Sequence, residues 1–203
     1  MNWFIVFAVV TILIGLNALY VAGEFATVSA RRSRLLQMAE EQDSHSLRLL
    51  LPYLGDAGKL DTYVAACQIG ITVSSLILGF YGQASLTTIL TPVLVGLGSF
   101  SPAAAASITT IVVLALLTIL QVVLGELVPK NIGVQYPERL ALLTVRPVGW
   151  SLLLFRPLIG LFNGSGRLIL RLLGMHGAAE HIHLHAPEEI LMLVEESGAG
   201  GLL

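Results

Sequence analysis

The chain alternates between long apolar runs and shorter polar segments that hold nearly all of its charge. The first apolar run extends from Trp3 to Val28, the second from Asp61 to Gly82, and the third from Ala103 to Glu126. Each run is long enough to cross a hydrocarbon core of about 30 Å at roughly 1.5 Å per residue. The pattern therefore predicts three transmembrane helices.

Polar positions between these runs suggest where the helices begin and end. Asp is a favourable N-cap residue, so Asp61 is expected to begin the second span. The segment from Ser85 to Val95, interrupted by Pro92, is expected to form a short interfacial or re-entrant helix. A glycine-rich and serine-rich loop from Gly96 to Pro102 would then lead into the third span.

Two further segments have amphipathic patterns. Residues Ser33 to Lys59 place leucines on one side and charged residues on the other, which predicts a cytoplasmic helical hairpin. Residues Pro137 to Leu173 are apolar but repeatedly interrupted by arginine, so no uncharged stretch of about 18 residues is present. This segment predicts two or three amphipathic juxtamembrane helices, with a fourth span as the alternative.

Composition and charge placement turn this pattern into a topology. The chain is 55% hydrophobic and only 12% charged, whereas soluble domains have about 25% charged residues. All 11 Lys and Arg residues lie in two blocks, from Arg31 to Lys59 and from Lys130 to Arg171. The positive-inside rule places both blocks in the cytoplasm, which gives an outside N-terminus and a cytoplasmic C-terminus. We expect an all-α integral membrane protein in the plasma membrane.

Residues 1–174 are predicted to form the transmembrane domain with its juxtamembrane helices. Residues 175–203 are more polar and are expected to be a cytoplasmic linker and the start of a truncated soluble region. Four histidines between His176 and His185 could suggest zinc, but their spacing favours a solvated linker. The single Cys67 is expected to be a small packing residue.

Two acids inside the spans are the candidates for chemistry. Glu24 and Glu126 lie near the C-terminal ends of their helices, where the helix dipole disfavours an anion. Ion pairs with Arg31, Arg34 or Lys130 could offset this cost, Lys130 being four residues after Glu126, as could protonation of the acids. The alternative is a bound cation, because an ionised acid within a membrane often marks a functional site.

The surrounding residues suggest oxygen ligands for such a cation. Pro129 has no N–H, so the carbonyl of Gly125 loses its usual helical partner. Thr72 and Ser75 are three residues apart and are expected to share a helix face. Magnesium prefers about six oxygens at roughly 2.1 Å. The predicted magnesium ligands are Glu126, Gly125, Thr72, Ser75, Gly23 and Glu24.

The chain resembles the CorC/CNNM magnesium transporter family, in its membrane domain. The resemblance rests on Ala-Gly-Glu-Phe-Ala at residues 22–26, Ala-Ala-Cys-Gln-Ile-Gly-Ile-Thr at 65–72 and Gly-Glu-Leu-Val-Pro-Lys at 125–130. Many members have asparagines on the second span where this chain has Ile71, Thr72 and Ser75, and a serine where it has Val21. The resemblance therefore implies ligation by backbone carbonyls and hydroxyls here.

The resemblance also implies a homodimer in the lipid bilayer that exports magnesium, with sodium entry as one coupling reaction. Its members continue into CBS domains that bind ATP, so nucleotide binding would belong to domains outside this chain. No nucleic-acid partner is expected. The rival hypothesis is a non-transporting membrane anchor or regulator that acts through those cytoplasmic domains. An enzyme is not expected, because the spans offer neither a histidine pair nor a nucleophile with a base.

Overall fold

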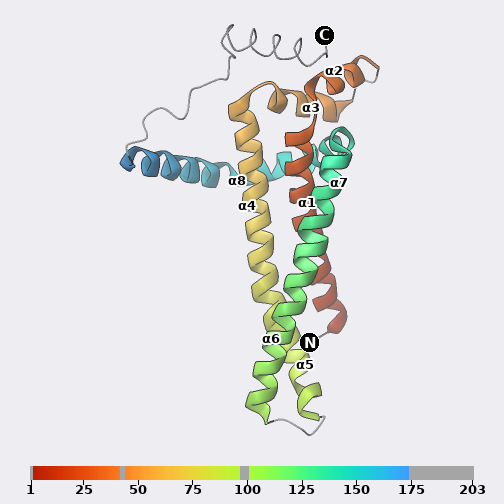
Figure 1. Cartoon of the computed structure of the whole chain (residues 1–203), viewed down its shortest axis with the longest axis vertical. Coiled ribbons are helices and arrows are strands. Elements are labelled where there is room, and N and C mark those ends of the chain that lie inside the picture. The colour runs from red at the N-terminus through yellow and green to blue at the C-terminus, as the bar shows by residue number, and fades with distance from the viewer. Residues whose placement is uncertain (1, 42–43, 97–100, 174–203) are drawn as a thin grey trace, which may run out of the picture. The chain divides into compact units, whose positions relative to one another are not determined.

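The computed structural model describes residues 2–41, 44–96 and 101–173, and these residues form helices throughout (Figure 1). The element bounds are α1 Trp3–Ser29, α2 Arg32–Glu41, α3 His45–Leu54, α4 Ala57–Ile77, the π-helix η1 Leu78–Gly82, α5 Gln83–Gly96, α6 Pro102–Leu120, the π-helix η2 Gln121–Leu127, α7 Val128–Gln135 and α8 Pro137–Leu172. The all-α membrane fold class is confirmed. The histidine tract and residues 175–203 lie outside the described residues.

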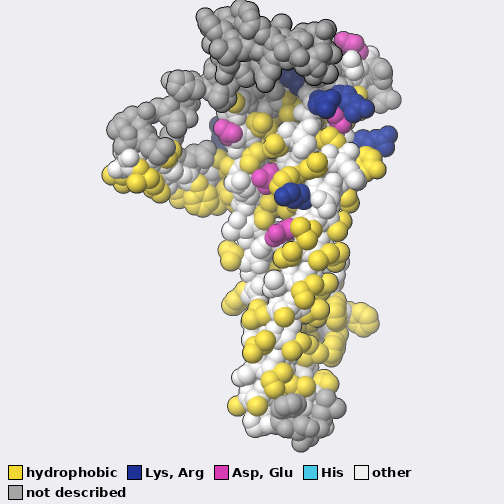
Figure 2. All heavy atoms as spheres, viewed as in Figure 1, with side chains coloured by type: hydrophobic (Ala, Val, Ile, Leu, Met, Phe, Trp, Pro, Cys, Tyr) yellow, Lys and Arg dark blue, Asp and Glu magenta, His cyan; other side chains and the backbone are white. Residues whose placement is uncertain are grey.

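Four helical stretches among the described residues are long and apolar enough to cross a membrane: Trp3–Ser29, Ala57–Gly96, Pro102–Gln135 and Pro137–Leu172. The first three contain the predicted spans. The fourth coincides with the predicted juxtamembrane region and could by its length and composition also be a span. The three-span topology and its orientation therefore stay predictions. Figure 2 shows hydrophobic side chains along most of the helical bundle, with charged side chains gathered toward one end.

The second span begins earlier than predicted. Asp56, rather than Asp61, is the N-cap of α4, and its Oδ1 accepts a hydrogen bond from the Lys59 backbone N–H at 3.0 Å. The predicted cap at Asp61 is wrong because the α3 helix already ends at Leu54, and the chain can start a new helix directly after Gly55. Asp61 lies in the second turn of α4 instead.

The cap predicts a small difference between two aspartates of the same helix. Asp56→Ala should lower the free energy of unfolding by about 1 kcal/mol, because it leaves a helix-terminal N–H without its acceptor. Asp61→Ala is the matched control and should change it by no more than about 0.5 kcal/mol. Thermal unfolding of the two purified variants checks this, and equal losses would argue against capping by Asp56.

The second and third spans are longer than predicted. Helix α4 continues through η1 into α5 as one stretch of 40 residues, so Ser85–Val95 does not form a separate interfacial or re-entrant helix. Pro92 lies inside α5 without ending it. The third span likewise continues from α6 through η2 into α7. Both stretches change from α-helical to π-helical hydrogen bonding along their length.

The predicted hairpin is confirmed as α2 and α3, which contact each other. The following juxtamembrane segment differs from expectation, because α8 is one helix of 36 residues rather than two or three. Pro147 and Pro157 lie inside it, and a helix can absorb an internal proline as a local bend. The end of α8 from Gly160 onward belongs to a second compact unit and is described only as the continuing helix.

Helix α1 is the central element of the first unit, Met1–Ile159. It packs against α4, η2 and α7, which run alongside it in Figure 1. One apolar core surrounds Val6, Val10 and Leu13 of α1. Another surrounds Ala26 and includes Tyr63 of α4. Between these two cores, α1 carries a single buried polar side chain, Asn17.

Candidate functional site

Asn17 is fully buried and connects all three predicted spans. Its Nδ2 donates a hydrogen bond to the carbonyl oxygen of Gly125 in η2 at 3.1 Å. Its Oδ1 accepts hydrogen bonds from the hydroxyls of Ser74 at 2.9 Å and Ser75 at 3.1 Å, both on α4, and the Ser74 hydroxyl shares its one proton with the Gly70 carbonyl of its own helix at 2.8 Å. One amide therefore holds the second and third spans against α1.

Gln121 of the third span completes this arrangement. Its Nε2 donates to the Ser75 hydroxyl at 3.0 Å. Its Oε1 is buried and has no hydrogen-bond partner among the described residues. We call the side chains of Asn17, Ser74, Ser75 and Gln121, with the Gly125 carbonyl, the Asn17 cluster. It brings five oxygen atoms together, and one of them, Gln121 Oε1, has no hydrogen-bond partner among the described residues.

Local sequence explains why Gly125 reaches this cluster. Pro129 cannot donate a hydrogen bond to the Gly125 carbonyl, and the surrounding residues form the π-helix η2. A Cβ atom added at Gly125 would lie 3.0 Å from Asn17 Nδ2 and 3.3 Å from Gln121 Cδ. Glycine is thus what lets the α1 amide approach the third span, and π-helical turns of this kind are frequent at functional sites.

The cluster lies deep within the bundle. Asn17 is near the middle of the 27-residue helix α1, which places it close to the bilayer midplane if α1 spans the membrane. The apolar core around Leu13 and Leu117 lies on one side of it, and the core around Ala26 and Cys67 lies on the other. The cluster is therefore a polar layer between two apolar layers, which is where membrane transporters place ion sites.

The structure brings together two of the six predicted ligand residues, Ser75 and Gly125. Thr72 does not join them, since it is exposed and its hydroxyl donates to the Gln68 carbonyl at 2.8 Å. The Thr72 hydroxyl thus bonds within its own helix here, and its role as a ligand stays a prediction. Ser74 accompanies Ser75 in the cluster instead, because the hydroxyls of both serines lie within hydrogen-bond distance of Asn17 Oδ1.

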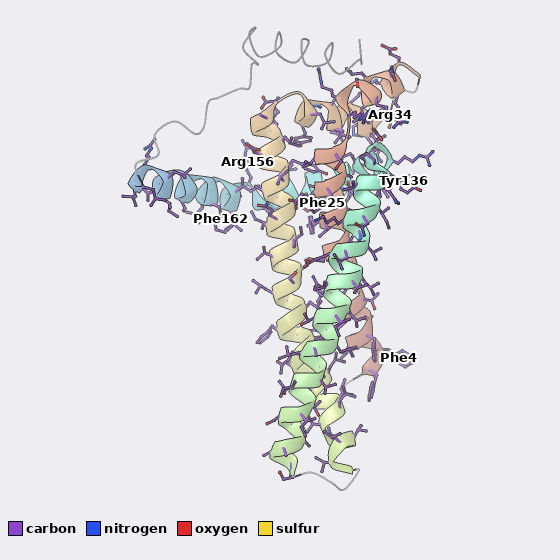
Figure 3. All side chains as sticks on the ribbon, viewed as in Figure 1. Phe4, Phe25, Arg34, Tyr136, Arg156 and Phe162 are labelled. Carbon is purple, nitrogen blue, oxygen red and sulfur yellow. The ribbon has the colours of Figure 1, made fainter. Side chains whose placement is uncertain are left out.

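Glu126 follows Gly125 but its side chain is exposed. Among the described residues, no basic group lies within 4.0 Å of its carboxylate. The alternative of an ion pair with Lys130 is therefore wrong in this arrangement. The Lys130 ammonium lies 4.7 Å from the centre of the Phe25 ring, which Figure 3 labels on α1.

Gly23 and Glu24 lie two turns further along α1, outside the Asn17 cluster. Gly23 packs closely on α8, since an added Cβ would lie 3.2 Å from Val148 and 3.3 Å from Thr144. The Glu24 carboxylate is partly buried and faces the Gln68 side chain, a hydrogen-bond donor. Gly23 thus has a packing role and Glu24 a polar partner. Neither residue belongs to the Asn17 cluster.

Sequence reasoning missed Asn17 and gave no role to Ser74 or Gln121. Asn17 could have been found as the one amide in the apolar run from Trp3 to Tyr20, because buried amides in membrane helices usually bond across helices. Gln121 stands out in the same way on the third span. The π-helical register that turns Gln121 and Gly125 toward α1 has no comparable signal in the sequence.

The chemistry of the cluster is that of neutral oxygen ligands. Amide, hydroxyl and backbone carbonyl oxygens bind hard cations such as Mg²⁺, more weakly than carboxylates do. Among the described residues, no three His, Cys, Asp or Glu side chains are grouped closely enough to hold a metal ion. The arrangement suits transient binding of a partly dehydrated cation.

Comparison with known proteins gives the family. Residues 8–203 match the family described as the cyclin M transmembrane N-terminal domain. The chain is 38% identical over 190 residues to UPF0053 protein YhdT and 37% identical over 195 residues to UPF0053 protein YrkA, both of Bacillus subtilis. It is 36% identical over 193 residues to an uncharacterized protein of Mycobacterium tuberculosis.

These matches cover 94%, 94% and 95% of this chain, and 40%, 43% and 53% of the respective relatives. The chain therefore corresponds to about half or less of these proteins' length. The match extends over nearly all of the chain and includes every residue of the Asn17 cluster. The chain belongs to the cyclin M (CNNM) transmembrane domain family.

Proposed function

We propose that this domain transports divalent cations across the membrane, with Mg²⁺ as the cargo, and that the ion is bound at the Asn17 cluster. The observation that carries the proposal is the Gln121 Oε1 atom, which is buried without a hydrogen-bond partner among the described residues, on a side chain that packs against Gly125. A buried acceptor without a partner is costly in a membrane interior. A cation at this position would satisfy it.

Asn17 has a specific role in this mechanism. Its Nδ2 donates to the Gly125 carbonyl, and we propose that an ion which binds this carbonyl from the same side displaces the amide. Rotation of the Asn17 side chain would then present Oδ1 to the ion in place of Nδ2. In the described structure the Asn17 amide donates to the carbonyl that the ion would use, and it thereby holds the third span in register.

Glu126 supplies the negative charge that the cluster lacks. It follows Gly125 directly, so a small rotation of η2 would bring its carboxylate toward an ion at the carbonyl. An exposed carboxylate on a membrane span is unfavourable, and a second copy of the chain packed over it would remove that cost. This cost supports the homodimer that the family resemblance suggests.

The wider assignments form part of this proposal. We infer a plasma membrane protein with a cytoplasmic C-terminus, because both basic blocks fall on one side of the three predicted spans. Export of Mg²⁺, with sodium entry as a coupling reaction, is the direction that the resemblance suggests. No catalytic activity is proposed for the domain.

Binding of Mg²⁺ can be tested with a matched pair of variants. Mg²⁺ at ten times its dissociation constant should stabilise the purified protein by about 1.4 kcal/mol, seen as a rise in Tm. Gln121→Leu should abolish this rise, because it removes the unpartnered oxygen. Thr72→Val is the control and should keep it, since Thr72 bonds only to its own helix. Equal shifts in both variants would overturn the assignment of the site.

Glu126→Gln tests the part played by the carboxylate. The variant should lose most of the Mg²⁺-dependent rise in Tm while keeping the Tm measured without Mg²⁺, because the Glu126 side chain is exposed in the described structure. Flux into vesicles separates transport from the anchor hypothesis. Full-length protein should carry Mg²⁺ with wild-type Glu126 and fail with Glu126→Gln. Binding without any flux would favour a non-transporting sensor.

A further inference from the structure

A groove lies between the start of α4, the end of α3 and the first part of α8. It has a volume of about 360 Å³, and two basic side chains, Lys59 and Arg156, contribute to its lining. The rest of the lining is mainly apolar and includes Leu152, Leu153 and Ile159. No Asp or Glu is found among the described residues that line it. The groove therefore combines a positively charged part with a wall suited to hydrocarbon.

The two cations are available to an incoming anion. Lys59 forms only a long, exposed contact of 4.0 Å with Asp56, and such surface pairs contribute little. Arg156 is exposed, and no carboxylate of the described residues lies within 4.0 Å of it. Figure 3 labels Arg156 on α8. A bound anion would therefore not have to break a strong ion pair.

A second groove on the other side of Tyr53 and Gly149 repeats the same chemistry. Its volume is about 500 Å³, and Arg146 and His45 line it together with Trp150. Trp150 is 76% exposed, and exposed tryptophans with nearby arginines are typical of the membrane–water interface. This part of α8 thus presents basic and apolar groups together, where lipid head groups meet acyl chains.

We propose that the groove between Lys59 and Arg156 binds one anionic phospholipid, with its phosphate between the two cations and an acyl chain along Leu152, Leu153 and Ile159. Basic pockets between membrane helices on the cytoplasmic side are known to select anionic head groups. The apolar wall favours a lipid over a soluble phosphate, which could use only the charged part. The bound lipid would link α8 to the start of the second span.

Gly149 allows the groove to be closed without removing charge. It borders both grooves, and a Cβ atom added there would have no heavy atom within 4 Å. The Cβ of a larger residue is thus accommodated at this position, and the ring of Gly149→Phe should occupy part of the groove. Gly149→Ala is the matched control, because a methyl group leaves most of the volume open and favours the helix.

The test is lipid binding to the purified full chain in nanodiscs of mixed phosphatidylglycerol and phosphatidylcholine, with bound lipids counted by native mass spectrometry. Each basic side chain near an anionic surface corresponds to about a fivefold preference, so the wild type should prefer phosphatidylglycerol about 25-fold. Lys59→Gln with Arg156→Gln should remove this preference, as should Gly149→Phe. Gly149→Ala and Arg139→Gln, a cation of α8 outside the groove, should retain it.

Three results would overturn the proposal. One is equal binding of the two lipids by the wild type. Another is an unchanged preference in both Gly149→Phe and the double Gln variant. The third is displacement of phosphatidylglycerol by millimolar inorganic phosphate, which would identify the ligand as a soluble anion. If the double variant fails to fold, the comparison of Gly149→Phe with Gly149→Ala still decides the question, independently of Mg²⁺ transport.

Discussion

Asn17→Leu is expected to lower the free energy of unfolding by about 2 kcal/mol and to abolish stabilisation by Mg²⁺. The change removes three hydrogen bonds between helices, to Gly125, Ser74 and Ser75. Such bonds contribute about 0.6 kcal/mol each within a membrane. Thermal unfolding with and without Mg²⁺ measures both effects. Thr88→Val is the control, because Thr88 bonds only to its own helix and should leave both quantities unchanged.

Asn17→Asp separates a structural role from a role in ion binding. The carboxylate keeps the acceptor for Ser74 and Ser75 but places a negative charge 3.1 Å from the Gly125 carbonyl oxygen, where Nδ2 donates in the wild type. Stability without Mg²⁺ should therefore fall, and the rise in Tm with Mg²⁺ should exceed that of the wild type. A variant that is destabilised equally with and without Mg²⁺ would show that Asn17 only holds helices together.

Gly70→Ala is expected to destabilise the domain by about 2 kcal/mol. An added Cβ would lie 2.5 Å from two ring carbons of Tyr20. The ring cannot move aside freely, because the Tyr20 hydroxyl is hydrogen-bonded to the Ser151 hydroxyl at 2.7 Å. Overpacking of this kind typically costs 1–3 kcal/mol, about 2 kcal/mol here. Thermal unfolding of the purified variant gives the measurement.

Gly79→Ala provides the matched control for Gly70→Ala. It lies nine residues further along the same continuous helix, and an added Cβ would have nothing within 4 Å. Its stability should equal or slightly exceed that of the wild type, since alanine favours helix over glycine by about 1 kcal/mol. Shortening the neighbour, in Gly70→Ala with Tyr20→Leu, should recover part of the loss. Equal stability of Gly70→Ala and Gly79→Ala would contradict the packing of α1 on α4.

The sequence predicted the long apolar helices because apolar runs act on the scale of whole helices, while the number of spans and their orientation stay predictions. It located α1 to within a residue and anticipated the α2–α3 hairpin. It placed the start of the second span five residues too late, since Asp56 and Asp61 are equally good caps by residue type. The choice between Asp56 and Asp61 depends on where α3 ends, and the end of α3 depends in turn on how that helix packs.

The candidate site was predictable only in part, for a similar reason. Pro129 drew attention to the Gly125 carbonyl, which bonds to the same Asn17 side chain as the predicted Ser75; the role of both as ligands stays a prediction. Helical spacing then suggested Thr72 as its companion, whereas the position of Asn17 favours Ser74. The π-helical turns η1 and η2 shift the register of both spans, and they depend on contacts between helices rather than on local residue preference.

The central claim is that the Asn17 cluster binds the transported cation. The most direct measurement is a structure of the protein with Mn²⁺ in place of Mg²⁺, with the ion located by its anomalous scattering. We predict a peak at about 2.1 Å from the Gly125 carbonyl oxygen and Gln121 Oε1, with the Asn17 amide displaced from that carbonyl. A peak at Glu126 or Glu24 alone, with Asn17 still bonded to Gly125, would contradict it.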